Sequence, residues 1–198
     1  MKEIFPVFDQ LMSKQDKEKL LNQNAHVFWL TGLSGSGKTT IAKNLEKKLY
    51  QNGFLTQIID GDNVRSGICN NLSFSLDDRM ENIRRISEIS KLFINCGIIT
   101  INCFVSPTVK IRKLAKKIIG AKNFHNIYIN ASVKECEQRD IKGLYKKARS
   151  GEIKDFTGIS SPFEVPKNPE LEINTSRLSI QESVNKAFDY IYPLILKK

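Results

Sequence analysis

The chain has 198 residues, of which 40% are hydrophobic and 26% are charged, as is typical of a single globular domain. No apolar run approaches the ~20 residues of a membrane-spanning helix and the N-terminus lacks a secretory signal, so we expect a cytoplasmic protein with no membrane partner. The net charge of +10 favours anionic ligands, and without a nucleic-acid-binding motif we expect small molecules rather than nucleic acid.

Residues 1–25 are polar with scattered apolar side chains, and they predict an N-terminal arm that packs against the domain or against a partner subunit. Ser13 is placed to cap a short helix over residues 17–21. From residue 26 onwards, apolar runs alternate with stretches that carry apolar residues at helical spacing. We expect strands over residues 27–31, 55–59, 98–105, 126–130 and 171–174. We expect helices over residues 38–51, 76–95, 106–119, 133–140 and 178–196, with an exposed loop over 63–75.

This alternation predicts an α/β fold, a three-layer sandwich with a mostly parallel five-stranded sheet and helices on both faces. The arm then precedes a single domain over residues 26–198. Residues 141–169 combine glycines, prolines and many charges, and a segment of that length without clear periodicity predicts a lid over a site. The cysteines lack metal-ligand spacing, so we expect no zinc site, with Cys96 and Cys103 in the core.

Residues 32–39 read Gly-Leu-Ser-Gly-Ser-Gly-Lys-Thr and lie between a predicted strand and a predicted helix, which is the context of a phosphate-binding loop. Its glycines let successive main-chain N–H groups converge on one anion, and the helix adds the positive end of its dipole. We expect Lys38 to reach the β- and γ-phosphates of a nucleoside triphosphate, and the Thr39 hydroxyl to hold Mg²⁺. With this loop, the predicted sandwich is of the P-loop NTPase type. The predicted nucleotide-binding residues are Gly32, Leu33, Ser34, Gly35, Ser36, Gly37, Lys38, Thr39 and Thr40.

Two aspartates follow the second predicted strand, in the sequence Asp60-Gly61-Asp62. Because ligands of parallel α/β sheets bind beyond the carboxyl ends of the strands, these carboxylates and Ser106 should lie beside the phosphate loop. Phosphoryl transfer to a hydroxyl needs a carboxylate near the acceptor O–H and negative ligands around Mg²⁺. We assign Asp62 to the acceptor hydroxyl and Asp60 to Mg²⁺ or its waters, although the two roles could be reversed.

Arg65 and Arg79 flank Phe74, an aromatic residue in a polar loop. Guanidinium groups suit phosphate or sulfate oxygens, and an exposed ring beside them suits stacking on a base. Phe156 in the predicted lid offers a second ring, which either completes a sandwich around the base or belongs to the core of the lid. A guanine-reading Asn-Lys-x-Asp element is absent from the sequence, and this favours a kinase over a GTP-dependent switch.

The sequence from residue 26 onwards resembles the adenylylsulfate kinase (APS kinase) family across nearly its whole length. The segments that carry the resemblance are residues 29–35, 60–65, 78–85, 104–107, 139–145, 148–153 and 156–159. The resemblance implies that the chain transfers the γ-phosphoryl group of ATP to the 3′-hydroxyl of adenosine 5′-phosphosulfate. The products would be 3′-phosphoadenosine 5′-phosphosulfate and ADP, as in sulfate activation, and the family implies a homodimer that uses ATP and Mg²⁺.

The resemblance also implies roles for individual residues. It places Arg139 near the base of ATP, and it gives a catalytic set of Lys38, Asp60, Asp62 and Ser106. Ser106 matches a position described in the family as a phosphoserine intermediate, but direct in-line transfer needs only positioning and charge stabilisation, so Ser106 could instead bind a phosphate or the acceptor. The acceptor would be bound by Asp62, Asn63, Arg65, Phe74, Arg79, Asn82, Val105, Ser106, Lys142 and Phe156.

Three positions around the acceptor depart from the family pattern. Ser73 and Asp155 stand where glycine is usual, and Ser160 stands where an aspartate is common. Asp155 puts a negative charge near an anionic ligand unless it points to solvent. These departures leave an alternative open, a kinase of the same build that acts on another nucleotide, such as a modified cytidine diphosphate used in surface-polysaccharide synthesis.

Overall fold

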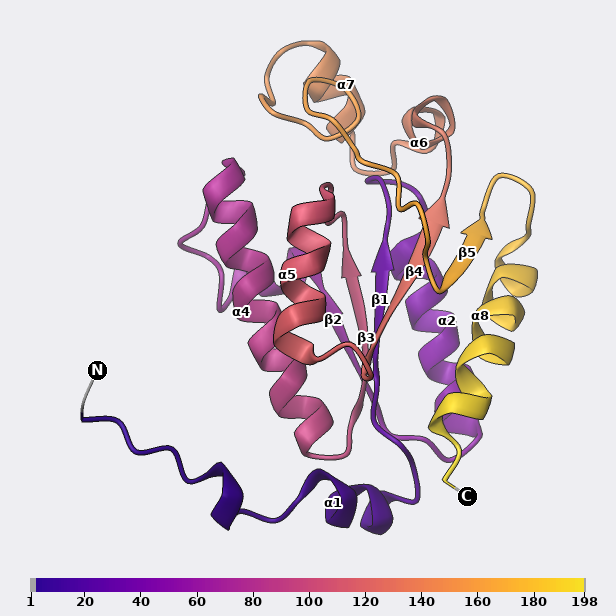
Figure 1. The fold of residues 1–198 in the computed structure, drawn as a ribbon. Coiled ribbons are helices and arrows are strands. Elements are labelled where there is room, and N and C mark those ends of the chain that lie inside the picture. Colours follow the sequence, from indigo (N-terminus) through magenta and orange to yellow (C-terminus); the bar gives the residue numbers. More distant parts are fainter. Residues whose placement is uncertain (1–2, 198) are drawn as a thin grey trace.

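The computed structural model describes residues 3–197, and its centre is a sheet of five parallel strands in the order β2-β3-β1-β4-β5 (Figure 1). The strands are β1 (Val27–Thr31), β2 (Thr56–Asp60), β3 (Ile99–Phe104), β4 (Phe124–Asn130) and β5 (Leu171–Asn174). The predicted parallel sheet is therefore confirmed. Because every strand runs in the same direction, all five carboxyl ends meet at one edge of the sheet, and residues 141–169 arch over that edge (Figure 1).

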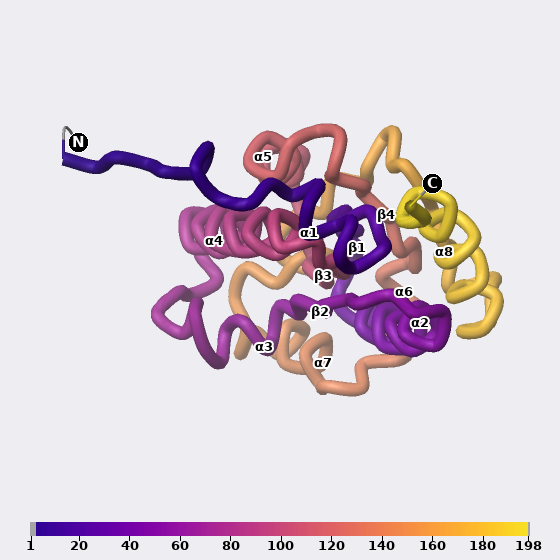
Figure 2. Tube along the Cα trace, turned by 90° about the horizontal axis from the view of Figure 1, so that it is seen from below, coloured from indigo at the N-terminus to yellow at the C-terminus, as the bar shows by residue number. Residues whose placement is uncertain are grey.

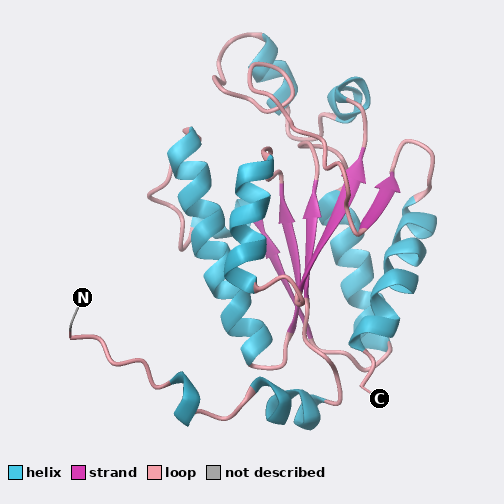
Figure 3. Cartoon of the chain, in the orientation of Figure 1, coloured by secondary structure: helices cyan, strands magenta, loops and turns pink. Residues whose placement is uncertain are grey.

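Helices cover both faces of the sheet, which gives the three predicted layers (Figures 1 and 3). The helices are α1 (Lys14–Leu21), α2 (Lys38–Gln51), α3 (Gly61–Ser66), α4 (Leu76–Asn95), α5 (Val109–Ile119), α6 (Val133–Arg139), α7 (Leu144–Arg149) and α8 (Ile180–Ile195), with a 3₁₀ turn η1 (Phe8–Gln10). Strand β1 is buried on both sides. Phe28 and Leu30 enter the core beneath α2 and α8, whereas Val27 and Trp29 enter the core beneath α4 and α5.

Three local predictions are corrected by the structure. The expected loop after β2 begins with a short helix, α3, because the Asp60 carboxylate caps it by accepting from the Asp62 N–H at 3.0 Å. The helix expected from Ser106 begins only at Val109, since Thr108 is its N-cap and Ser106 has φ of 42°, outside the helical region. The predicted lid contains one helix of its own, α7.

The two halves of the N-terminal arm differ. Ser13 caps α1 as expected, and the capping starts the helix at residue 14 rather than 17. The segment after α1 is joined to the domain, because the Gln23 side chain donates to the carbonyls of Leu55 and Gly97. Residues 3–12 instead extend away from the domain (Figures 1 and 2), and their large apolar side chains are exposed, with Phe5 at 83%.

Cys103 is buried as expected, but the prediction for Cys96 is wrong, because this residue caps the C-terminus of α4 and is exposed. Within residues 3–197, no group of three or more His, Cys, Asp or Glu side chains is arranged to hold a metal ion. No helix in the same range is long and apolar enough to cross a membrane.

Candidate active site

The phosphate loop joins β1 to α2, and its glycines are required by its shape. Gly35 and Gly37 have φ of 76° and 99°, which lie in the left-handed region that favours glycine. Gly32 passes so close to β4 that a Cβ atom there would lie 2.4 Å from the Ile129 carbonyl oxygen. The loop can therefore curl over the carboxyl end of β1 only with glycine at these positions, and it leads directly into the N-terminus of α2.

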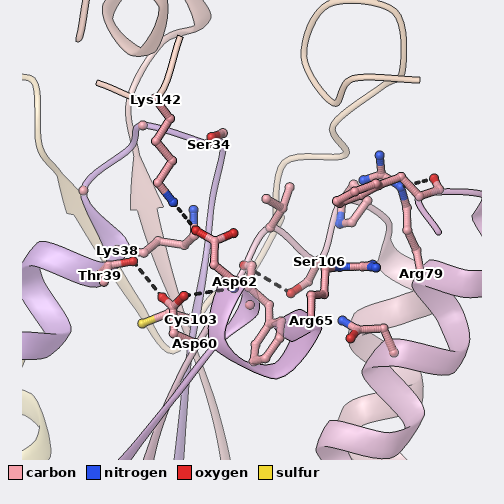
Figure 4. A pocket seen from close by; sticks show the side chains of 18 of the residues that line it. Ser34, Lys38, Thr39, Asp60, Asp62, Arg65, Arg79, Cys103, Ser106 and Lys142 are labelled. Atoms are coloured by element: carbon pink, nitrogen blue, oxygen red, sulfur yellow. Dashed lines mark hydrogen bonds and ion pairs between the residues drawn. The ribbon is translucent and has the colours of Figure 1, made fainter. Parts of the chain in front are cut away.

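The first turn of α2 carries the two predicted phosphate and metal ligands. The Lys38 ammonium donates to the carbonyls of Gly32 at 2.9 Å and Leu33 at 2.7 Å. Burial lowers the pKa of Lys38 to about 8, because the charged form is poorly solvated there. The Thr39 hydroxyl donates to the Asp60 carboxylate at 2.8 Å (Figure 4). The structure thus brings a cation and two oxygen ligands to the same edge of the sheet.

The second aspartate of the Asp60-Gly61-Asp62 sequence has a different environment from the first. Asp60 is 9% exposed and caps α3, whereas Asp62 is exposed in the first turn of that helix. The Asp62 carboxylate forms an ion pair with Lys142, which comes from the segment before α7 (Figure 4). This ion pair connects the lid to the carboxylate that we assigned to the acceptor hydroxyl.

Arg65 and Arg79 lie across the cleft from Lys38 (Figure 4), and both form a cluster with Phe74, which also lines the cleft. The guanidinium carbon of Arg65 lies 4.3 Å from the centre of the Phe74 ring, and that of Arg79 lies 5.7 Å from it. The ring itself is 60% exposed. Burial lowers the pKa of both arginines, which nevertheless remain charged at neutral pH because their ordinary pKa is so high.

Arg79 also reaches the lid. Its guanidinium group donates to the Thr157 hydroxyl at 3.0 Å and to the Asp155 carbonyl at 2.7 Å, and its Nε donates to the Phe74 carbonyl at 2.8 Å. Asp155 has φ of 55°, which explains why glycine suits this position in the family, and its side chain is exposed. The negative charge that the sequence places here is therefore solvated rather than enclosed in the cleft.

Two buried polar residues also line the cleft. Asn82 on α4 is 4% exposed, and its side-chain oxygen has no hydrogen-bond partner among residues 3–197. A buried amide oxygen without a partner is costly, so a ligand donor at this position would be strongly favoured. Ser106 is 2% exposed, and its hydroxyl accepts from the Trp29 indole at 2.7 Å.

These groups share one cleft of about 280 Å³ at the carboxyl ends of the strands. Most of the predicted site residues line it. They are Ser34, Gly35, Gly37, Lys38, Thr39, Thr40, Asp60, Asp62, Arg65, Phe74, Arg79, Asn82, Val105, Ser106 and Lys142. The phosphate loop, the two carboxylates, the two arginines and Lys142 thus surround a single space, although they are spread over more than a hundred residues of sequence.

The remaining predicted residues lie around this cleft rather than in its lining. Gly32, Leu33 and Ser36 form the body of the phosphate loop, and Asn63 is exposed on α3. Arg139 donates to the carbonyls of Gly35 at 3.3 Å and Thr175 at 2.8 Å, beside the loop.

Phe156 lies in a small apolar cluster under the lid. Its ring meets Tyr145 edge-to-face with the ring centres 5.0 Å apart, and the cluster includes Leu33 of the phosphate loop. The structure therefore places Phe156 in the core of the lid, which was one of the two environments expected for it. Phe156 is not among the residues that line the cleft, and its part in a sandwich around the base stays a prediction.

Two residues that support the phosphate loop had no role in the sequence analysis. The Tyr145 hydroxyl donates to the Ser34 carbonyl at 2.8 Å, and the Thr175 hydroxyl donates to the Ser36 carbonyl at 2.9 Å. Tyr145 lies within the segment 139–145 that carried the family resemblance, so a signal was present there. Thr175 directly follows β5, and its position at the carboxyl edge of the sheet could have identified it.

Comparison with known proteins gives consistent matches. The Adenylylsulphate kinase family model matches residues 24–174. An adenylyl-sulfate kinase of Phocaeicola vulgatus is 56% identical over 195 residues, which cover 98% of this chain and 96% of that protein. That of Clostridium kluyveri is 52% identical and covers 91% of this chain and 90% of its own length. The solved structure of the Mycobacterium tuberculosis APS kinase in complex with AMPPNP and APS matches with a TM-score of 0.82 at 41% identity, covering 85% of this chain and 98% of its own.

The family match begins before β1 and ends with β5, so it contains the whole sheet and all the residues that line the cleft. It includes the phosphate loop, the Asp60–Asp62 turn and the arginine cluster described above. The relatives match almost from end to end, so the similarity does not rest on the phosphate loop alone. The chain therefore belongs to the adenylylsulfate kinase family.

Proposed function

We propose that this chain transfers the γ-phosphoryl group of ATP to the 3′-hydroxyl of adenosine 5′-phosphosulfate, giving 3′-phosphoadenosine 5′-phosphosulfate and ADP. One observation carries the proposal. A single cleft is lined by Lys38 and Thr39 of the phosphate loop, by Asp62 and by Arg65, Phe74 and Arg79. Asp62 lies between Lys38 and Arg65 (Figure 4). A triphosphate and a second anionic nucleotide can therefore meet across Asp62.

Mg²⁺ fits the ligands that the cleft offers. The Thr39 hydroxyl at the start of α2 and the Asp60 carboxylate at the end of β2 lie 2.8 Å apart, and a hard divalent cation prefers such oxygen atoms. Mg²⁺ commonly takes only one or two protein ligands and completes its shell with phosphate oxygens and waters. We propose that Thr39 and Asp60 hold Mg²⁺, which when bound neutralises charge on the phosphate oxygens.

The side chains of the cleft then divide the work of transfer. The acceptor oxygen forms a bond to the γ-phosphorus while the bond from that phosphorus to the β,γ-bridging oxygen of ATP breaks. Asp62 accepts the proton that the acceptor hydroxyl loses, and Lys38 stabilises the charge that develops on the phosphates. The lid reaches the same point through Lys142, and its closure excludes water that would otherwise accept the phosphoryl group.

The direct test is ADP release from ATP and Mg²⁺ against a panel of acceptors. We expect turnover with adenosine 5′-phosphosulfate, and far less with adenosine 5′-monophosphate, which lacks the sulfate, or with cytidine diphosphate derivatives. The same panel run with Lys38→Ala controls for contaminating kinases. A wild-type enzyme that turns over a cytidine nucleotide, but not adenosine 5′-phosphosulfate, would contradict the proposal.

We further propose that the enzyme acts as a cytoplasmic homodimer and does not bind nucleic acid. The exposed apolar side chains of residues 3–12 support a subunit contact, because such side chains are rarely left in water together. Light scattering of the full chain and of a chain that lacks residues 1–12 measures the contribution of this segment to the oligomer. Oligonucleotide binding with a steep salt dependence would contradict the last part of the proposal.

A further inference from the structure

Ser106 has an unusual backbone conformation for a residue that carries a side chain. It follows β3 at the carboxyl edge of the sheet, and its φ is 42°. Such left-handed residues are strained unless they are glycine, and they persist only where the surroundings hold them. Val105 and Pro107 on either side line the cleft, so the conformation of Ser106 decides where the wall of the cleft runs.

Two long side chains hold this turn from different directions. The Trp29 indole N–H donates to the Ser106 hydroxyl at 2.7 Å, and the Arg112 guanidinium donates to the Ser106 carbonyl at 2.7 Å. Trp29 is fully buried in β1, and Arg112 is 7% exposed in α5. Since neither donor has water as an alternative partner, losing Ser106 as acceptor would leave a buried donor unsatisfied.

The Ser106 hydroxyl is fully engaged by its neighbours. It accepts from Trp29 and donates to the Phe104 carbonyl at 3.3 Å. Its hydrogen bonds within residues 3–197 include no carboxylate or imidazole that could remove its proton. A serine that carries a phosphoryl group needs a general base beside its hydroxyl, and this one has instead a fixed donor and a fixed acceptor.

Arg112 also connects the turn to the end of the lid. Its other terminal nitrogen donates to the Glu164 carbonyl at 2.7 Å. The Glu164 N–H donates to the Pro107 carbonyl at 2.8 Å, and the Glu164 carboxylate accepts from the Val109 N–H at 2.5 Å. The chain that returns from the lid is therefore tied to the same turn as β1 and α5.

We propose that Trp29 and Arg112 are positioning residues for the acceptor, and that the Ser106 hydroxyl is the anchor through which Trp29 acts. This inference rests on the proposed transfer to adenosine 5′-phosphosulfate. Trp29 fixes the hydroxyl and Arg112 fixes the carbonyl, so the wall formed by Val105–Pro107 stays in place without help from the substrate. A preorganised wall lowers the cost of binding the acceptor in line with ATP.

The test measures KM for each substrate and kcat in Trp29→Phe, Ser106→Ala and the double variant. We expect KM for adenosine 5′-phosphosulfate to rise about tenfold in each single variant, as the loss of one buried hydrogen bond implies, with KM for ATP changed less than twofold. The double variant should be no worse than the poorer single variant, because both remove the same bond. The inference would be overturned if the two substitutions raised the acceptor KM additively in the double variant. It would also be overturned if KM for ATP rose as much as KM for the acceptor.

The turnover number of Ser106→Ala separately tests the role of the Ser106 hydroxyl. Ser106→Ala retains turnover if the hydroxyl is an anchor, and it loses turnover by at least about a thousandfold if the hydroxyl carries the phosphoryl group.

Arg112→Met should raise the acceptor KM, and Arg112→Lys should raise it less because lysine keeps a donor. Phe124→Leu is the matched control. The centres of the Phe124 and Trp29 rings lie 5.8 Å apart in an apolar contact, so this variant should leave the acceptor KM unchanged.

A spectroscopic measurement keeps the inference testable if Trp29→Phe does not fold. Trp29 is the one tryptophan of the sequence, so its fluorescence reports on its own hydrogen bond. We expect a blue-shifted emission in folded Ser106→Ala, and no shift in Phe124→Leu. An unchanged spectrum in Ser106→Ala would overturn the contact. Wild-type protein that does not turn over adenosine 5′-phosphosulfate would contradict the proposed function instead, and the spectrum would still decide the contact.

Discussion

At the scale of single residues, Lys38 carries the charge closest to the expected phosphates. Its ammonium group bonds to two carbonyls of the loop, so it is held at the mouth of the phosphate site before any ligand arrives. We predict that Lys38→Ala lowers kcat by at least about a hundredfold, the loss seen when one preorganised donor is removed from a transition state. Lys43→Ala, an exposed lysine of the same helix, is the matched control in the ADP-release assay. Wild-type turnover in Lys38→Ala would remove Lys38 from the mechanism.

Phe74 offers the exposed ring of the acceptor side, with Arg65 stacked on it. Stacking on an aromatic side chain contributes about 1–3 kcal/mol per base, so we predict that Phe74→Ala raises the acceptor KM roughly 5- to 150-fold. KM for ATP should remain within twofold. Leu76→Ala removes another exposed apolar side chain nearby and serves as control. Equal losses for both substrates would show that the ring does not belong to the acceptor site.

At the scale of elements, Arg79 at the start of α4 donates hydrogen bonds to Thr157 and Asp155 of the lid. We predict that Thr157→Val loosens the lid, because the variant keeps the shape of the side chain but removes the hydroxyl that accepts from Arg79. Hydrogen exchange of residues 150–160 should accelerate, while exchange in β1 and β3 stays unchanged. Thr56→Val, a hydroxyl removed from a strand remote from the lid, is the control. Equal exchange in the lid of both variants would contradict the role of this contact.

The elements of the sheet were predictable because their signals are local. The apolar runs of β1 and β3 and the glycines of the phosphate loop each report on structure within a few residues. The start of α5 was not, because it depends on the left-handed turn at Ser106. Trp29, which is distant in the sequence, bonds to the hydroxyl of this residue, and Arg112 of α5 bonds to its carbonyl.

The residues of the candidate site also differ in whether local sequence signals identify them. Lys38, Asp60 and Arg65 were found through motifs, and the family resemblance supplied Asn82 and Lys142. Thr175 was missed because its contact with Ser36 exists only once β5 has joined the sheet beyond β4. The surroundings of Phe156 likewise depend on how the lid folds onto Tyr145.

At the scale of the whole molecule, stability should depend on a histidine pair that belongs to the opposite end of the sheet from the cleft. His26 Nδ1 lies 3.1 Å from His125 Nε2, and His125 Nδ1 lies 2.9 Å from the Tyr190 hydroxyl. Burial, together with the neighbouring His125, lowers the pKa of His26 from 6.5 to about 4. Burial also lowers the pKa of His125.

The folded protein therefore binds protons on this pair less readily than the unfolded chain does. The free energy of unfolding should be constant above pH 6.5 with respect to these groups, and should fall as the pH decreases from 6.5 towards 4. Urea unfolding at pH 7, 6 and 5 measures the slope, and His26→Asn should flatten it. An identical slope in wild type and His26→Asn would contradict the prediction. At pH 7 the activity of His26→Asn should equal that of the wild type, since neither histidine lines the cleft.

The side-chain amide of Gln23 touches the chain just before two neighbouring strands. It accepts from the Leu55 N–H and donates to the carbonyls of Leu55 and Gly97, ahead of β2 and β3. One glutamine thus joins the two chain segments beside the main-chain bond that the Ile99 N–H donates to the Leu55 carbonyl at 3.3 Å. A shortened chain made for crystallography therefore has to keep residues 13–25, because trimming them would open the bottom of the sheet to water and to neighbouring molecules.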